Sequence, residues 1–290
     1  MILPTKLGEW LVNFIKDRKF NVKIEQTISE IYDINAGLGQ GTVLSPILFS
    51  IFINDFTDIT KIPTNKINNL LFADDLFAAV TDKNIRRLFM LIQGYLCKLE
   101  WWFNRWRLQI STHKCSYCLY SLGRVPILIK DNILNLKIFD EFLKVDFNPK
   151  YLGMLLDKRC SFNNHADKIK EKCKKSLNIL NNLSGKNWSL DENSKLNIYK
   201  CLIRSKMEYA APVLITSDYF KIAMNGIQYK SLRTIYKQPP RCSSTMLHKK
   251  AKIATVEQRI NYLAKSYLDK AVKNNNPLIK NSRRSHKLYW

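Results

Sequence analysis

Hydrophobic and polar positions follow different periods along the two halves of the chain. Apolar residues between Leu7 and Ile15 recur at helical spacing, and two short runs between Phe20 and Ile34 alternate with a period of two. Ser45–Pro46 suits the cap and first turn of a well-buried helix. Apolar residues from Ala166 to Leu180 repeat every three or four positions, and further helical patterns flank Pro212. The pattern predicts a mixed front followed by an all-helical back.

The run NNLLFADDLFAAV, residues 68–80, places two adjacent acids between apolar segments, which predicts a hairpin with Asp74 and Asp75 at its tip. A plain turn is one reading, because Asp is a common turn residue. However, the tip lacks the usual Gly or Asn, and its apolar flanks predict carboxylates close to a low-dielectric sheet. A bound cation would relieve their repulsion, and oxygen ligands favour Mg²⁺. Two metals there would suit phosphoryl transfer.

Charge is distributed unevenly. The chain carries 47 basic and 24 acidic residues, a net charge of +23, yet residues 1–75 hold only 7 basic and 9 acidic ones. The whole positive excess therefore lies after the acid pair, and residues 211–290 alone carry 16 basic against 3 acidic residues. Such a field favours a polyanion, since each Lys or Arg that neutralises a phosphate releases counterions. A solubilising surface is the alternative, but nucleic acid is the favoured partner.

Length and composition indicate a globular chain. Its 290 residues, 46% of them hydrophobic, suit one large or two modest domains. No uncharged apolar stretch reaches membrane length, and the first residues lack the pattern of a secretory signal, so we expect an intracellular chain outside membranes, nuclear or cytoplasmic.

The seven scattered cysteines are typical of reduced thiols in a core. His113, Cys115 and Cys118 lack a second ligand pair, so zinc is not favoured there.

Four motifs then carry a family resemblance. FADD, residues 72–75, resembles the signature of reverse transcriptases from non-LTR, LINE-type retrotransposons. GLGQGTVLSPILFSIFINDF, residues 37–56, is similar to the glycine-glutamine-glycine turn of that family and the helix after it. RLQISTHKCSY resembles a family segment that contains a lysine, and YLGMLLD, residues 151–157, resembles its primer-grip hairpin. The basic helices that follow resemble the thumb, so the resemblance covers nearly the whole chain.

The resemblance implies a fold and a set of roles. It implies a partial right-hand polymerase palm over residues 1–157, with an antiparallel sheet and packed helices, and a basic helical thumb and C-terminal extension over residues 158–290. Asp74 would be the principal ligand of Mg²⁺, or of Mn²⁺, and Asp75 the second. The other implied site residues are Gly39, Gln40, Gly41, Phe72 and Ala73 at the template and incoming nucleotide, Lys114 at the leaving pyrophosphate, and Tyr151, Leu152 and Gly153 at the primer. The implied partners are an RNA template, a DNA primer and deoxynucleoside triphosphates.

Several of these residues also have a purely structural explanation. The turn around Gln40 also reads as a strand-to-helix connection that needs positive φ. Lys114 also reads as an ordinary surface lysine. Trp101, Trp102 and Trp106, interleaved with arginines, would suit base stacking, but aromatic residues at helical spacing are more often core. We therefore expect these three tryptophans to be buried.

Two departures from the family bear on activity. The family commonly has proline at the position of Gly39, which bears on the rigidity of the turn. Polymerases of this class also use a third carboxylate from a strand upstream of the turn, and no acid in residues 1–36 has the expected aromatic-Asp context. The chain therefore reads as an N-terminally truncated reverse transcriptase with impaired activity. The alternatives are a catalytically inactive fragment that still binds nucleic acid, and a basic helical module unrelated to polymerases.

Overall fold

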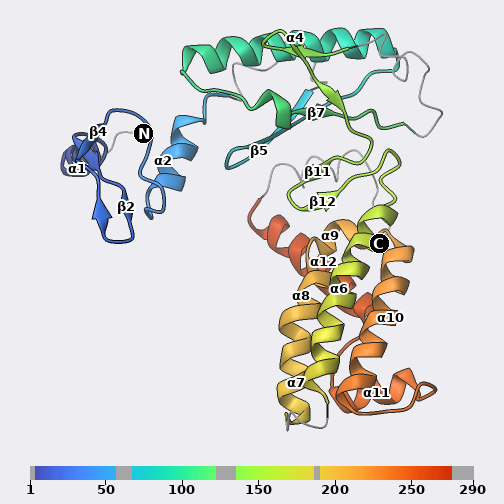
Figure 1. Cartoon of the computed structure of the whole chain (residues 1–290). Coiled ribbons are helices and arrows are strands. Elements are labelled where there is room, and N and C mark those ends of the chain that lie inside the picture. Colours follow the sequence, from blue (N-terminus) through green and yellow to red (C-terminus); the bar gives the residue numbers. More distant parts are fainter. Residues whose placement is uncertain (1–3, 57–66, 122–134, 186–189, 276–290) are drawn as a thin grey trace. The chain divides into compact units, whose positions relative to one another are not determined.

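The computed structural model describes residues 4–56, 67–121, 135–185 and 190–275 (Figure 1). The chain divides into two compact units. The hairpin unit comprises residues 1–110 with 136–141, and the helical unit comprises residues 111–135 with 142–290. Helices and strands are mixed, as the α+β prediction requires. The functional boundary expected at Asp157 stays a prediction.

The hairpin unit begins with a helix and two small strand pairs. α1 spans Thr5–Ile15, and β1 (Arg18–Phe20) pairs antiparallel with β4 (Tyr32–Ile34). Between them, β2 (Lys23–Ile24) and β3 (Thr27–Ile28) form a hairpin. The predicted helix is confirmed, but the two predicted strands are replaced by four shorter ones, and Val22 and Ile31 lie outside them.

The next helix, α2 (Ser45–Phe52), differs from its prediction. None of its residues is buried, and Ile47 and Ile51 are 58% and 64% exposed. The expectation of a well-buried helix is wrong, because no described segment covers these side chains. The expectation that Ser45 caps the helix is also wrong, since its hydroxyl donates to the Gly39 carbonyl instead.

A long helix packs beside the acidic hairpin. β5 (Ile67–Phe72) pairs antiparallel with β6 (Asp75–Val80), in a register that runs from Ile67 opposite Val80 to Phe72 opposite Asp75. α4 (Ile85–Arg105) begins after Asn84, whose side chain accepts the N–H groups of Arg86 and Arg87 at 3.0 and 3.2 Å. This helix contacts β6 and also β8 (Lys137–Ile138), which pairs with β9 (Glu141–Phe142). Its buried residues are Phe89, Tyr95, Leu96, Leu99 and Trp102.

The helical unit is built around α6 (Asn163–Leu183), which buries the predicted stripe of Ala166, Ile169, Cys173, Leu177 and Leu180. α10 (Asp218–Ile235) packs along α6, and α12 (Val256–Lys273) packs against α10 and α9 (Ala211–Leu214). Further helices of this unit are α7 (Glu192–Tyr199), the π-helical η2 (Lys200–Arg204), α8 (Ser205–Glu208) and α11 (Ser244–Ala251) (Figure 1). The break expected near Pro212 occurs at Ala210, which has φ +58°.

Short strands precede α6 in the same unit. β7 (Ser116–Tyr117) pairs parallel with β10 (Lys144–Val145). β11 (Lys150–Tyr151) pairs antiparallel with β12 (Met154–Leu155), so the predicted hairpin at residues 151–157 is confirmed. Among the helices that the structure describes, none has the length and apolar character needed to cross a bilayer.

Candidate functional site

The acid pair lies at an exposed hairpin tip. Ala73 and Asp74 form the two-residue turn, and Asp75 begins β6 opposite Phe72. Ala73 has φ +52°, a conformation that glycine usually supplies in such turns. Asp74 and Asp75 are both exposed to solvent, although Asp75 is paired in the sheet and Asp74 lines an apolar pocket beside it. Within the described residues neither carboxylate forms a hydrogen bond or an ion pair, which leaves both free for a cation.

An apolar pocket of about 260 Å³ adjoins the tip. Asp74 is its one charged lining residue. The other lining residues come from α2 and its end, the hairpin, and the C-terminal part of α4 and the segment after it: Phe49, Ile53, Phe56, Leu71, Leu76, Phe103, Leu108 and Gln109. Phe56 is wholly buried and lies edge-on to Trp102, with 5.0 Å between ring centroids. A packed aromatic base therefore supports the hairpin that carries the acids.

The glycine-rich turn before α2 is held by two hydroxyl groups. Ser45 Oγ donates to the Gly39 carbonyl at 2.6 Å, and Thr42 Oγ1 donates to the same oxygen at 3.2 Å. The two hydroxyls also lie 2.5 Å apart. Gly41 has φ +80°, and a Cβ at Gly39 would come within 3.1 Å of Thr42 Cγ2. The hydroxyl pair thus restrains the turn at the point where the family commonly has proline, and Gln40 remains exposed.

Arg18 restrains the start of the same turn. Its Nη2 donates to the carbonyls of Ala36 and Gly37 at 3.2 and 2.6 Å, and its Nε donates to Ile15 at 2.9 Å. The side chain therefore joins the end of α1 to the turn. The sequence interpretation missed this residue, since nothing in its context distinguishes it from neighbouring basic residues.

Lys114 and the acid pair belong to different units of the chain. Lys114 ends a short 3₁₀ helix, η1 (Thr112–Lys114), and it is exposed. Lys114 belongs to the helical unit and Asp74 to the hairpin unit, so packing within either unit does not bring them together.

The prediction that the cysteines lie in the core is wrong for most of them. Only Cys173 is buried, and Cys97, Cys160 and Cys201 are exposed. Burial raises the pKa of Cys173 to about 11, and partial burial raises the pKa values of Cys115 and Cys118. Metal coordination needs the thiolate, which a raised pKa disfavours. No cluster of three His, Cys, Asp or Glu residues suited to a metal occurs among the described residues.

The β11–β12 hairpin is fixed to the helices of its own unit. Leu152 and Gly153 form its turn with φ values of +44° and +84°. The Tyr209 hydroxyl donates to the Leu152 carbonyl, and the Leu155 N–H donates to Nδ1 of buried His165 at 3.3 Å. A Cβ at Gly153 would lie 3.4 Å from the Tyr209 ring. The hairpin with the three residues expected at the primer is therefore bonded to the helices of its own unit.

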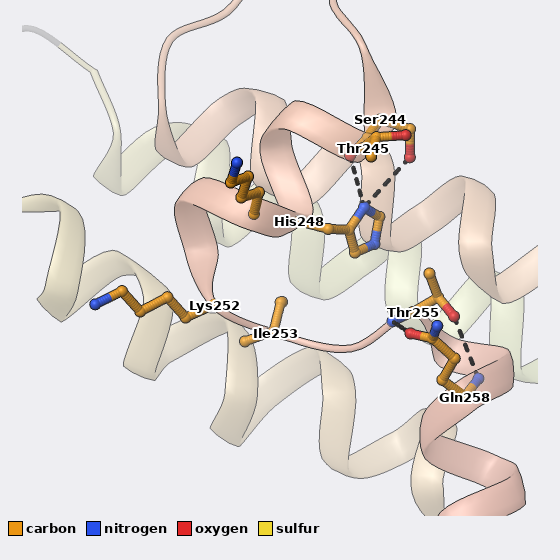
Figure 2. Close-up of a pocket in the computed structure, with 8 residues that line it drawn as sticks. Ser244, Thr245, His248, Lys252, Ile253, Thr255 and Gln258 are labelled. Atoms are coloured by element: carbon orange, nitrogen blue, oxygen red, sulfur yellow. Dashed lines mark hydrogen bonds between the residues drawn. The ribbon is translucent and has the colours of Figure 1, made fainter.

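A second pocket, of about 400 Å³, lies between α11 and α12 and contains none of the expected site residues (Figure 2). His248 Nδ1 donates to the Ser244 carbonyl at 2.7 Å. Thr255 and Gln258 form a reciprocal capping box that satisfies their own two amides at the start of α12 (Figure 2), and the Val256 N–H donates to Asn225 Oδ1. These three amides at the helix start are therefore already used within the chain.

The tryptophan cluster is only partly core. Trp102 is fully buried, as expected, but Trp101 and Trp106 are 52% and 37% exposed, so the expectation of burial is wrong for these two. The helical period places Trp101 nearly opposite Leu99 on α4, and about 100° around the helix from Trp102.

The described residues thus contain an exposed, adjacent carboxylate pair on a β-hairpin and a restrained glycine-glutamine turn in one unit, and many exposed basic residues in the helical unit. Residues 1–156 match the model of the reverse transcriptase (RNA-dependent DNA polymerase) family, and the chain belongs to that family.

Curated relatives extend the similarity along the chain. The chain is 24% identical, over 93% of its length, to the RNA-directed DNA polymerase from mobile element jockey of Drosophila melanogaster, and 25% identical, over 96%, to that of Drosophila funebris. It is 26% identical, over 98%, to the probable RNA-directed DNA polymerase from transposon X-element of Drosophila melanogaster. These matches cover 29%, 30% and 31% of the relatives, so the chain spans about a third of their length. They bear out the resemblance to non-LTR retrotransposon polymerases.

Proposed function

We propose that this chain carries the metal-binding hairpin and part of the template-primer contacts of an RNA-directed DNA polymerase. The single observation that carries the proposal is the pair of exposed, unpartnered carboxylates of Asp74 and Asp75 at the β5–β6 tip, within a chain of this family. Residues 1–157 act as a partial palm, and residues 158–290 act as a thumb with a C-terminal extension. The order of the elements supports this assignment.

The residues present suit a hard divalent cation. Asp74 and Asp75 offer oxygen ligands only, and no described cation neutralises them. Mg²⁺ is held in proteins by one or two carboxylates together with waters and substrate phosphates, which agrees with two acids on an open tip. Mn²⁺ accepts the same ligands. When bound, the metal neutralises charge that develops on the phosphate during transfer.

The reaction is attack by the primer 3′-hydroxyl on the α-phosphate of a deoxynucleoside triphosphate, opposite an RNA template. Gln40 contacts the nascent base pair, and Gly39 and Gly41 leave room for close approach. Phe72 and Ala73 lie beside the incoming nucleotide, and Lys114 neutralises the leaving pyrophosphate. Tyr151, Leu152 and Gly153 hold the primer. The hydroxyl contacts on Gly39 support a restrained position for Gln40, since they fix the backbone one residue away.

The second candidate function is nucleic-acid binding without synthesis. The observation that favours it is the absence, among the described residues, of a third His, Cys, Asp or Glu near the acid pair. The exposed side of α6 meanwhile carries Lys168, Lys172, Lys174 and Lys175 against Asp167 and Glu171. Basic side chains of this kind contact phosphates and carry no sequence readout.

Primer extension on an RNA template with Mg²⁺ tests the proposal. We expect incorporation that Asp74→Asn abolishes, because the amide removes the charge that holds the cation. Asp140→Asn is the matched control, since Asp140 is also an exposed turn aspartate, between β8 and β9. Salt-sensitive binding of template-primer without incorporation by the unmodified chain would support the second function instead. Equal activity in both variants would refute a role for Asp74.

A further inference from the structure

The outer face of α4 takes no part in the proposed chemistry. Its exposed residues recur three or four positions apart, opposite the buried stripe of the same helix: Arg87, Met90, Gly94, Cys97, Trp101 and Arg105, with Arg86 and the half-exposed Lys98 alongside. Met90 is 68% exposed and Trp101 is 52% exposed. We call this set the outer face of α4.

The outer face is cationic because the one acid of the helix is used elsewhere. Glu100 Oε1 accepts the N–H of Phe139 at 2.7 Å, which holds this carboxylate on the side of β8. Asp82, before the helix, pairs with Arg87 at 3.6 Å. Among the described residues, Arg86 and Arg105 form no ion pair with a carboxylate, so this face keeps positive charge at both ends of the helix.

Trp101 and Arg105 form an exposed stacking surface. The guanidinium carbon of Arg105 lies 5.3 Å from the centroid of the Trp101 ring. Both side chains stay exposed, so a planar group from outside can pack against them. Nucleic-acid proteins use arginine and aromatic side chains in this way to stack unpaired bases.

Gly94 adds an independent observation on the same face. A Cβ at Gly94 would have no heavy atom within 4 Å, so alanine would fit, and it would favour the helix by about 1 kcal/mol. Packing therefore does not require glycine there. A missing side chain in the middle of a cationic face allows another backbone to approach closely.

We propose that the outer face of α4 binds single-stranded nucleic acid, with its phosphates on Arg86 and Arg105 and a base on Trp101. A duplex fits less well, because its bases are already stacked. A bilayer fits less well because Met90 and Trp101 are the only large apolar side chains on the face, whereas interfacial helices bury a broad apolar side. This binding does not require polymerase activity.

The test uses the full chain and a fluorescein-labelled oligo(dT) of about twelve nucleotides, a length within the usual single-strand site size. We expect Trp101→Ala to weaken binding about tenfold, in line with the loss of one stacked base. Trp10→Ala is the matched control, because Trp10 is also 52% exposed and lies on α1 in the same unit. Trp101→Phe should retain part of the affinity, since a smaller ring still stacks.

Three results would overturn the inference. The first is failure of the unmodified chain to bind the oligonucleotide, and the second is an equal effect of Trp101→Ala and Trp10→Ala. The third is competition by phosphatidylserine vesicles that depends on Trp101, which would indicate a membrane surface. Circular dichroism of each variant excludes misfolding. Primer extension by Asp74→Asn is a separate measurement, so failure here leaves the proposed polymerase function standing.

Discussion

His165 is a single buried side chain that joins a hairpin to a helix. It is only 1% exposed, its ring stacks on Phe220, and its Nδ1 accepts the Leu155 N–H. Burial lowers its pKa below 6.5, and the nearby positive charges of Lys172 and Lys168 lower it further. The neutral ring is therefore the form that the folded state prefers.

The first prediction concerns acid sensitivity. Because the pKa of His165 is lowered on folding, its contribution to stability is fully present above pH 6.5 and is lost as pH falls below that value. His165→Gln, which keeps an acceptor for Leu155, should flatten the fall in denaturation midpoint between pH 7.5 and 5.5. His113→Gln, at an exposed position, should keep the slope of the unmodified chain. Identical slopes in all three proteins would contradict the prediction.

At the scale of elements, Tyr209 is a second contact, beside His165, between the β11–β12 hairpin and the helices. The residue lies where α8 ends, and its hydroxyl spans 57 positions of sequence to reach the Leu152 carbonyl. Tyr209→Phe keeps the ring beside Gly153 and removes only this bond, at a cost of about 1 kcal/mol. We expect faster hydrogen exchange at the amides of Leu152 and Gly153.

Tyr219→Phe is the control for that measurement. It also removes one hydroxyl contact, to Asp167 Oδ1 at 2.7 Å, but it leaves the hairpin turn untouched. If exchange at Gly153 rises equally in both variants, the Tyr209 contact does not anchor the turn.

The spacing of apolar residues along the chain was enough to predict most helices and strands. It was not enough to predict the contacts between them. The α6 stripe from Ala166 to Leu180 and the hairpin at Asp74 follow from the spacing of apolar residues, which is a local property. Burial of α2 could not be predicted, because it depends on whether a distant segment covers Ile47 and Ile51. The contacts of Arg18 and Tyr209 bridge residues far apart in sequence, and no local motif encodes them.

At the scale of the whole molecule, most basic residues follow the acid pair in the sequence. Residues 76–290 hold 40 of the 47 basic residues, and α6 presents several of them to solvent. If a defined surface grips the phosphate backbone, removal of its charges should change the salt dependence of binding as well as the affinity.

The last prediction compares two triple variants in binding to an RNA–DNA hybrid. Lys168, Lys172 and Lys175, all changed to Gln, should make the plot of log affinity against log salt shallower by about 2 to 3, because each phosphate contact contributes about 0.9. Lys16, Lys19 and Lys23, exposed in the hairpin unit, provide the same loss of charge away from α6. Their replacement should leave the slope close to that of the unmodified chain. Equal changes in both variants would mean that net charge, rather than the surface of α6, holds the nucleic acid.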